Sequence, residues 1–489
     1  MSPTPTSVQN AWQLPTCRPR RPMMTDTIQI LLLAVLTLAG TAHSQGLPAP
    51  AALESLTSLS PPSTQLQVPI ESWQTPQGSR VLFVHRPELP MFDLQVLFDA
   101  GSARDDGASG LAQLTLGMLK EGTQHRGAMQ IAEGFDEIGA RFYTSASRTK
   151  ATIRLRSLST EQHRSQAVAL LAEVLGQPLF ANEKRQEVKD QLINASTQRQ
   201  SLAYVKAVDR LFEHAYANHP FAANDTGTAQ SINNLQIADI TAFHQQALSA
   251  GNALITLVGD LSPEQARETA LQISAALPAG PRLPSLQPPA GFEAEIYHLD
   301  HPGTQSFLLF ALPGIDIQHT DAPALTLANL MLGGPGTTSR LFKVLRTERG
   351  LTYSAGAHLV QSTDSGLWIF TTEVQAKYQD GAMTLLENLL QDYADTGPTP
   401  QQFEDAKEQL RGSYLLGAVS NGQLSDLLAE MGFHQLPLDS RQTFLEQIEA
   451  LTLDQLKVAL KKHLKLDKLV QISVGPSVDQ HDLPEPASG

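Results

Sequence analysis

Residues 101 to 123 read GSARDDGASGLAQLTLGMLKEGT. Glycine, serine and aspartate dominate the first ten positions and predict a loop, whereas apolar side chains recur at helical spacing from Gly110 to Leu119. A similar stretch, LTLANLMLG, begins at Leu325, which lies 214 residues after Leu111. The same apolar helical pattern therefore occurs twice in the chain, from Leu111 and from Leu325.

Other segments repeat at nearly the same interval. The matched pairs are Phe92–Phe98 with Gln305–Ala311, Glu187–Leu192 with Asp405–Leu410, and Leu254–Gly259 with Leu469–Gly475. Matches in the same order at separations of 213 to 218 residues indicate an internal duplication. The period is too long for a solenoid, so the sequence predicts two homologous domains in tandem.

Each repeat mixes strand and helix patterns. Arg80–Val84 and Phe92–Phe98 are short β-branched or aromatic runs, and Thr152–Arg156 alternates between apolar and polar residues, so all three predict strands. Arg164–Leu175 and Glu183–Gln198 have helical spacing. Strands and helices do not alternate as in a doubly wound sheet. We therefore predict an α+β fold, in which each domain is a largely antiparallel sheet flanked by helices.

The N-terminal residues resemble an export signal. Arg18, Arg20 and Arg21 precede the apolar run Ile28–Ala39, and small residues follow at Ala42–Ser44. That run is as long as a signal-peptide core and too short to span a membrane. We expect export, to the periplasm if the source is Gram-negative.

Composition shifts divide the chain into six parts. We predict a signal peptide or leader (1–44), a flexible linker (45–68), an N-terminal domain (69–277), a second linker (278–291), a C-terminal domain (292–478) and a loose tail (479–489). The single cysteine, Cys17, falls in the leader. A chain without it has no thiol for catalysis or metal binding.

The overall charge restricts the possible partners. The 489-residue chain is 41% hydrophobic and 17% charged, and its formal net charge is −14. Such an acidic protein repels phosphate backbones, which argues against nucleic acid as a partner. No stretch after the leader is long and apolar enough to span a membrane. We interpret the basic run Lys461, Lys462, His463 and Lys465 as a solvated helix face.

From about Glu71 to Pro476 the chain resembles the pitrilysin/insulinase-like zinc peptidases. The segment that opens at Gly101 resembles their active-site stretch. Further landmarks follow in family order: Leu179-Phe180, His219–Phe221, Gly227-Thr228, Ser231-Ile232 and Val258–Asp260. The resemblance implies that the two domains form a clam-like peptidase fold.

The resemblance also locates a zinc site that this sequence lacks. Family members that hydrolyse peptides carry His-x-x-Glu-His on this helix, which places two zinc ligands and a general base on one helical face. The matching residues here are Gln113, Leu116 and Gly117, and Asn194 matches the third ligand. We therefore expect no catalytic residue, metal or cofactor of the chain's own.

The second repeat retains a different family segment. Residues 333 to 354 read GGPGTTSRLFKVLRTERGLTYS. In the family, an Arg and a Tyr seven positions later reach the zinc site of the other domain. The matching residues are Arg346 and Tyr353. A guanidinium and a phenol suit charge that develops on a carbonyl oxygen.

Local signals place this pair on a helix and a strand. Ser339 can cap a helix that runs to about Glu348, and Gly350 can end it. We predict that a strand starts at Leu351–Tyr353. Without the resemblance, a surface arginine that favours the helix C-terminus and a half-buried tyrosine in a strand would be the better interpretation.

Family members also work as pairs in which one chain bears zinc and its partner bears the Arg/Tyr pair. We therefore expect a non-catalytic subunit of an exported zinc metallopeptidase, with zinc in a homologous partner and a peptide as substrate. The substrate would extend a sheet edge near Arg141–Ala146, at Tyr143, Thr144 and Ser145. A peptide-binding or assembly protein, and an autonomous hydrolase, remain as alternatives.

Overall fold

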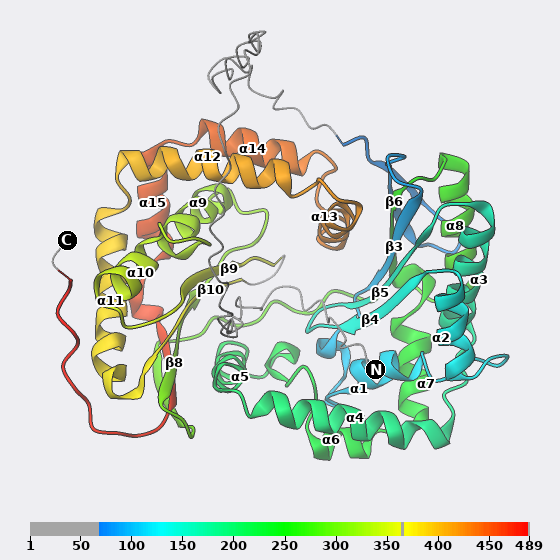
Figure 1. The fold of residues 1–489 in the computed structure, drawn as a ribbon, viewed down its shortest axis with the longest axis horizontal. Helices are drawn as coiled ribbons and strands as arrows, with labels where there is room; N and C mark the ends of the chain where they lie inside the picture. The colour runs from blue at the N-terminus through cyan, green and yellow to red at the C-terminus, as the bar shows by residue number, and fades with distance from the viewer. Residues whose placement is uncertain (1–67, 363–365, 488–489) are drawn as a thin grey trace, which may run out of the picture. The chain divides into compact units, whose positions relative to one another are not determined.

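The computed structural model describes residues 68–362 and 366–487. The predicted leader and, apart from Val68, the flexible linker lie outside these residues. Each repeat contains one sheet with helices against it (Figure 1).

The elements of the first repeat follow in chain order. They are β1 (Glu71–Gln74), β2 (Arg80–His85), β3 (Met91–Phe98), α1 (Leu111–Met118), α2 (Ala128–Glu137), β4 (Arg141–Ala146), β5 (Ala151–Leu158), α3 (Glu161–Gly176), α4 (Asn182–Gln200), α5 (Ala203–Ala215), α6 (Ala229–Asn234), α7 (Ile237–Ala247), β6 (Ala253–Gly259) and α8 (Pro263–Ala276). Short 3₁₀ turns, among them η3 (Pro220–Ala222), connect some of them.

The second repeat begins at a new strand. Its elements are β7 (Glu295–Asp300), β8 (Gln305–Pro313), α9 (Ala322–Gly333), α10 (Arg340–Phe342), the π-helical segment η5 (Lys343–Glu348), β9 (Ala355–Val360), β10 (Leu367–Gln375), α11 (Gln379–Thr396), α12 (Pro400–Leu416), α13 (Asn421–Phe433), α14 (Ser440–Ala450), α15 (Leu453–His463) and β11 (Val470–Gly475). Over residues 68–362 and 366–487, no helix combines the length and apolarity needed to cross a bilayer.

The two sheets have equivalent topologies. The first has the order β1-β2-β6-β3-β5-β4, and the second has the order β7-β11-β8-β10-β9. Only β2 with β6, and β7 with β11, are parallel, and the other neighbours are antiparallel. Without β1 the two orders coincide. The predicted α+β fold with largely antiparallel sheets and the predicted duplication are therefore confirmed.

Two buried lysines show how far the duplication extends. Lys189 on α4 and Lys407 on α12 occupy matching positions and are 2% and 8% exposed. Each Nζ donates a 2.8 Å hydrogen bond to a carbonyl at the end of a helix, Asn233 in α6 and Glu449 in α14. A cation at a helix C-terminus is favourable because the carbonyl groups there lack partners within the helix.

Each repeat places one helix on the sheet of the other (Figure 1). Helix α5 of the first repeat packs on β8 and β11, where Leu211 joins a buried cluster with Leu309. Helix α13 of the second repeat packs on β3 and β6, where Leu428 joins a cluster with Leu82 and Val258. In each sheet, one face is covered by a helix of the opposite repeat. Neither repeat therefore buries all of its apolar surface alone.

Polar contacts fix the position of α13. The Nε2 of Gln95, on β3, donates to Ser425 Oγ and Asp426 Oδ1, both at 2.9 Å. Arg154 on β5 forms a 2.7 Å ion pair with the same Asp426. Gln95 is 2% exposed, so its buried amide would be left without a partner if α13 shifted along the sheet.

The second linker and the tail are both held in place. Residues 277–294 contain no helix or strand, and Gly280 accepts a 3.0 Å hydrogen bond from the backbone N–H of Gly251. Residues 479–487, the described part of the predicted loose tail, make contacts with the second repeat. The backbone N–H of Ala487 donates to Glu348 at 2.7 Å, and Leu483 packs against the second core.

The exchange of helices makes a prediction about stability. Leu428→Ala, at a fully buried position of α13, should lower the free energy of unfolding by about 2–5 kcal/mol, because it leaves a cavity on the first sheet. Urea unfolding measures this value. Val458→Ala, at a position of α15 that is 67% exposed, should change it by less than about 0.5 kcal/mol. Equal effects of the two substitutions would contradict this packing.

Candidate functional site

Asp105 positions the start of α1. Its Oδ2 accepts from the backbone N–H of Gly110 at 2.8 Å, and its Oδ1 accepts from that of Ala112 at 2.9 Å. Gly110 has φ = +97°, a conformation that glycine adopts without strain. Asp105 is 2% exposed, and burial raises its pKa to about 7, although the backbone donors favour the ionised form. The loop and the helix are thus locked together by one carboxyl group.

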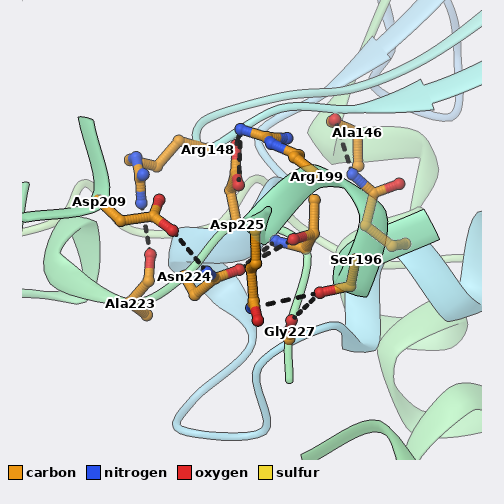
Figure 2. A network of polar contacts seen from close by, with 12 residues as sticks. Ala146, Arg148, Ser196, Arg199, Asp209, Ala223, Asn224, Asp225 and Gly227 are labelled. Atoms are coloured by element: carbon orange, nitrogen blue, oxygen red, sulfur yellow. Dashed lines mark hydrogen bonds and ion pairs between the residues drawn. The ribbon is translucent and has the colours of Figure 1, made fainter. Parts of the chain in front are cut away.

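The three positions that match the zinc motif lie on α1 as predicted, and none of them offers a ligand. Gln113 Nε2 donates to the carbonyl of Ala146 at 3.0 Å, a bond drawn in Figure 2, which ties α1 to the end of β4. Leu116 is 2% exposed and belongs to the first core. Gly117 has no side chain. The amide, the leucine and the glycine serve packing.

Helix α4 packs closely on α1 beside Gly117. A Cβ atom built at Gly117 would lie 2.9 Å from Cγ1 of Val188, which is closer than real Cβ atoms approach a neighbour. Val188 is 3% exposed, and Leu192, one turn further, also packs against the first core. Asn194 is exposed on α4, the helix that packs on α1.

These residues do not fit zinc. The metal takes imidazole, thiolate or carboxylate ligands, usually three or four of them. Within residues 68–362 and 366–487, the one set of three suitable side chains is His319, Asp321 and His463, in the second repeat. No catalytic step at α1 can therefore be routed through a bound metal.

Beside these helices, a polar network connects α4, α5 and the 221–228 segment (Figure 2). Arg148 donates to the carbonyl of Phe221 at 3.0 Å and to that of Ala223, and its guanidinium lies 3.9 Å from the ring centre of Phe212. Burial lowers the pKa of Arg148. The side chain holds α5 to the loop that follows it.

Two carboxylates share this network. Asp209 on α5 accepts a 2.9 Å hydrogen bond from Asn224, and Asp225 pairs with Arg199 of α4 at 3.3 Å. Burial, together with the nearby charge of Asp225, raises the pKa of Asp209 to about 6. These hydrogen bonds and ion pairs hold α4 and α5 to the 221–228 segment, so we assign the two carboxylates a structural role.

Arg346 and Tyr353 lie together in the second repeat. The guanidinium carbon of Arg346 lies 4.4 Å from the ring centre of Tyr353, and its NH1 donates to the carbonyl of Thr352 at 3.1 Å. Tyr353 is 81% exposed. The stacked pair therefore presents a phenol hydroxyl to the solvent on a fixed guanidinium.

The local structure around this pair differs in part from the sequence expectation. Ser339 takes the N-cap position, but its side chain makes no capping hydrogen bond. The helix continues as η5 to Glu348, and Gly350, with φ = +60°, follows it. The strand starts at Ala355 rather than at Leu351. Before it, the backbone forms a turn in which Thr352 Oγ1 donates to the carbonyl of Ser354 at 2.8 Å. Tyr353 is thus a loop residue.

The predicted substrate edge is an edge strand. β4 ends the first sheet and pairs with β5. Tyr143 and Ser145 are exposed on it, and Thr144, on the opposite face, is partly buried. An edge strand presents backbone groups that can pair with an added peptide.

Sequence reasoning missed the site formed by His319, Asp321 and His463. The run that contains His463 is interpreted above as a solvated helix face, but only 14% of the His463 side chain is exposed and its Nε2 lies 2.8 Å from Asp321 Oδ2. The interpretation was wrong for this residue because His463 contacts Asp321, which stands 142 positions earlier in the chain. A contact between such distant positions cannot be predicted from the local sequence pattern.

Two sequence models of one family match consecutive parts of the chain. Residues 80–228 match the model described as insulinase (peptidase family M16), and residues 234–410 match that of the peptidase M16 inactive domain. These ranges cover most of both repeats.

Individual relatives and structures agree with this match. The non-peptidase homolog YmxG of Helicobacter pylori is 26% identical over 396 residues, which are 80% of this chain and 90% of that protein. An uncharacterized zinc protease of Mycobacterium tuberculosis is 24% identical over 422 residues, 84% of this chain and 94% of that protein. The crystal structure of a peptidase M16 inactive domain from Pseudomonas fluorescens is 38% identical, with a TM-score of 0.82, over 85% of this chain and 100% of that one. A protease structure from Helicobacter pylori, 18% identical with a TM-score of 0.75, shares the fold.

Asp105→Asn should flatten the dependence of stability on pH. Because the folded pKa, about 7, exceeds the ordinary value of 3.8, the folded state holds this proton more tightly. Asp105 therefore contributes stability at pH 4 that is lost as the pH rises through 7, by at most about 4 kcal/mol. Urea unfolding between pH 5 and 8 should show a smaller decline in the variant. Asp106→Asn, at the exposed neighbour, should keep the wild-type slope, and identical slopes for both variants would sink the assignment.

Restoring the motif on α1 should not restore a zinc site. The triple variant Gln113→His, Leu116→Glu, Gly117→His should lose more than about 3 kcal/mol of stability, because it buries a carboxylate and forces a side chain against Val188. Zinc titration measures metal binding, and thermal unfolding measures the loss of stability. The titration uses a His463→Ala background so that the group formed by His319, Asp321 and His463 does not contribute to zinc binding. Adding Val188→Ala should recover part of the stability. Stoichiometric zinc binding by the triple variant would show that the helix tolerates the site.

Proposed function

Because the chain belongs to the M16 peptidase family and offers no zinc ligand on α1, we propose that it is the non-catalytic subunit of an exported zinc metallopeptidase pair. The residues at the motif positions carry the proposal, since Gln113, Leu116 and Gly117 supply neither the two imidazole ligands nor the general base of an active member. The name of the Helicobacter pylori relative, a non-peptidase homolog, favours the same role. Zinc would then belong to a homologous partner.

Arg346 and Tyr353 are the groups that the chain would supply to its partner. The π-helical turn η5 carries Arg346, and such turns occur frequently at functional sites. The guanidinium donates a hydrogen bond to the carbonyl of Thr352 and lies against the ring of Tyr353. A guanidinium and a phenol that lie together suit the stabilisation of a carbonyl oxygen that gains charge during hydrolysis.

The exposure of the Tyr353 side chain supports a role in contact with a partner chain. A large aromatic side chain that is 81% exposed has no role in the core of its own chain. Facing a partner, the hydroxyl could reach a substrate that both chains bind. The edge strand β4, with Tyr143 exposed by 54%, would bind peptide through main-chain hydrogen bonds.

A second candidate function is peptide binding without any peptidase partner. The edge strand β4 favours it, because it can accept a peptide whether or not a zinc chain is present. Export rests on the N-terminal 44 residues, which lie outside the described part of the chain. If the source is Gram-negative, the pair would act in the periplasm.

Tyr353→Phe tests the proposed contribution to a partner. In a complex reconstituted with a zinc-bearing homologue from the same source, the variant should lower kcat by roughly 10²–10³-fold, as loss of one transition-state donor does. Size-exclusion chromatography should show that the complex still assembles, because the exposed hydroxyl supports no packing.

Tyr204→Phe is the matched control, since this tyrosine is also partly exposed and its ring lies 6.4 Å from that of Phe307 on the second sheet. It should leave kcat unchanged. A fully active Tyr353→Phe complex would remove the role assigned to Tyr353, and peptidase activity of the isolated chain would remove the proposal itself.

A further inference from the structure

One group of metal-binding side chains lies apart from α1, where α9 begins and α15 ends. Asp321 is the N-cap residue of α9, His319 precedes it by two positions, and His463 is the last residue of α15. The two helices pack against each other, and residues of both belong to the second core. The packing therefore brings three potential ligands from two chain segments to one place.

The distances among these side chains suit a small divalent cation. Asp321 Oδ2 lies 2.8 Å from His463 Nε2 and 3.7 Å from His319 Nδ1. One ligand atom from each residue lies within 4.8 Å of the other two. In a tetrahedral zinc site with bonds of about 2.0–2.1 Å, ligand atoms are roughly 3.3 Å apart. Shifts of a few tenths of an ångström to about an ångström would complete the coordination.

The site is sheltered on one side and open on the other. The exposed fractions of the side chains are 14% for His463, 26% for Asp321 and 31% for His319. A neutral imidazole and an ionised carboxylate are the forms of these side chains that bind a metal.

We propose that His319, Asp321 and His463 form a binding site for a divalent transition metal of the zinc class, with water as the fourth ligand. Two imidazole nitrogens and one carboxylate oxygen are ligands that zinc accepts, and the open side leaves a position for water. The site differs from the family zinc site, which would lie on α1. It stands whether or not the chain has a peptidase partner.

Two existing contacts compete with the metal. Lys462 Nζ lies 2.7 Å from Asp321 Oδ2, and the backbone N–H of Asp321 donates to His319 Nδ1 at 2.9 Å. The Lys462 side chain is 54% exposed, so its ammonium can move into water when a cation of higher charge arrives. Lys462 therefore weakens metal binding, and its removal should strengthen it.

A bound metal would link the start of α9 to the end of α15. Ligand binding to the folded state raises stability by mass action, so the metal should raise the melting temperature. The π-helical segment with Arg346 follows α9 and α10 in the chain. The metal would thus secure the part of the second repeat from which the Arg346 and Tyr353 segment extends.

The test titrates the untagged full-length chain, carrying Cys17→Ser, with Zn²⁺ by calorimetry and with Co²⁺ by visible absorption. One equivalent should bind, and Co²⁺ should show the intense bands of a tetrahedral site. His463→Ala and His319→Ala each remove a proposed metal ligand. Each should lower the zinc affinity by more than roughly 100-fold, because the loss of a hydrogen-bond partner of a ligand already costs roughly 10–100-fold. Lys462→Ala should raise the affinity several-fold.

Two variants serve as matched controls. His298→Ala removes another histidine next to a carboxylate, 3.5 Å from Asp300, and Gln113→Ala alters the family zinc position. Both should bind Zn²⁺ like the wild type. Melting temperatures without metal check that each variant folds. The proposal is overturned if the wild type binds no stoichiometric Zn²⁺ at micromolar concentration, or if His463→Ala and His319→Ala bind it unchanged.

Discussion

Helix α4 approaches helix α1 so closely that the methyl group of Val188 fills the space beside Gly117. A larger residue at position 117 would need Val188 or the helix to shift. On the same helix Leu116 is buried in the core, and Gln113 bonds the end of β4. The three positions that match the zinc motif are thus occupied by side chains that pack or bond within the first repeat.

The exchange of α5 and α13 makes the two repeats one structural unit. Each helix covers one face of the other repeat's sheet, through Leu211 of α5 and Leu428 of α13. An apolar sheet face must be covered, and here the cover comes from the opposite repeat. The buried Nε2 of Gln95 favours the observed position of α13, since a shifted helix would remove its acceptors on Ser425 and Asp426. The duplication thus produced two halves that stabilise each other.

Much of this fold follows from local patterns. Strand periodicity, glycine and proline positions and the repeated stretch at Leu111 and Leu325 predict two α+β domains, and both sheets bear this out. The misjudged details involve contacts between distant segments or backbone that turns back on itself. Tyr353 lies in a loop because of the hydrogen bond from Thr352 to Ser354, and the tail is held because Ala487 reaches Glu348.

The amino-acid sequence by itself determined that the first repeat has no zinc motif, because side-chain chemistry at Gln113, Leu116 and Gly117 needs no coordinates to be judged. It also determined the duplication, since repeated patterns survive in one dimension. Only the tertiary structure decided that Val188 lies beside Gly117 and that His463 meets His319 and Asp321. Helix orientation and the meeting of residues 142 positions apart depend on how whole elements pack, and no local pattern of residues encodes that.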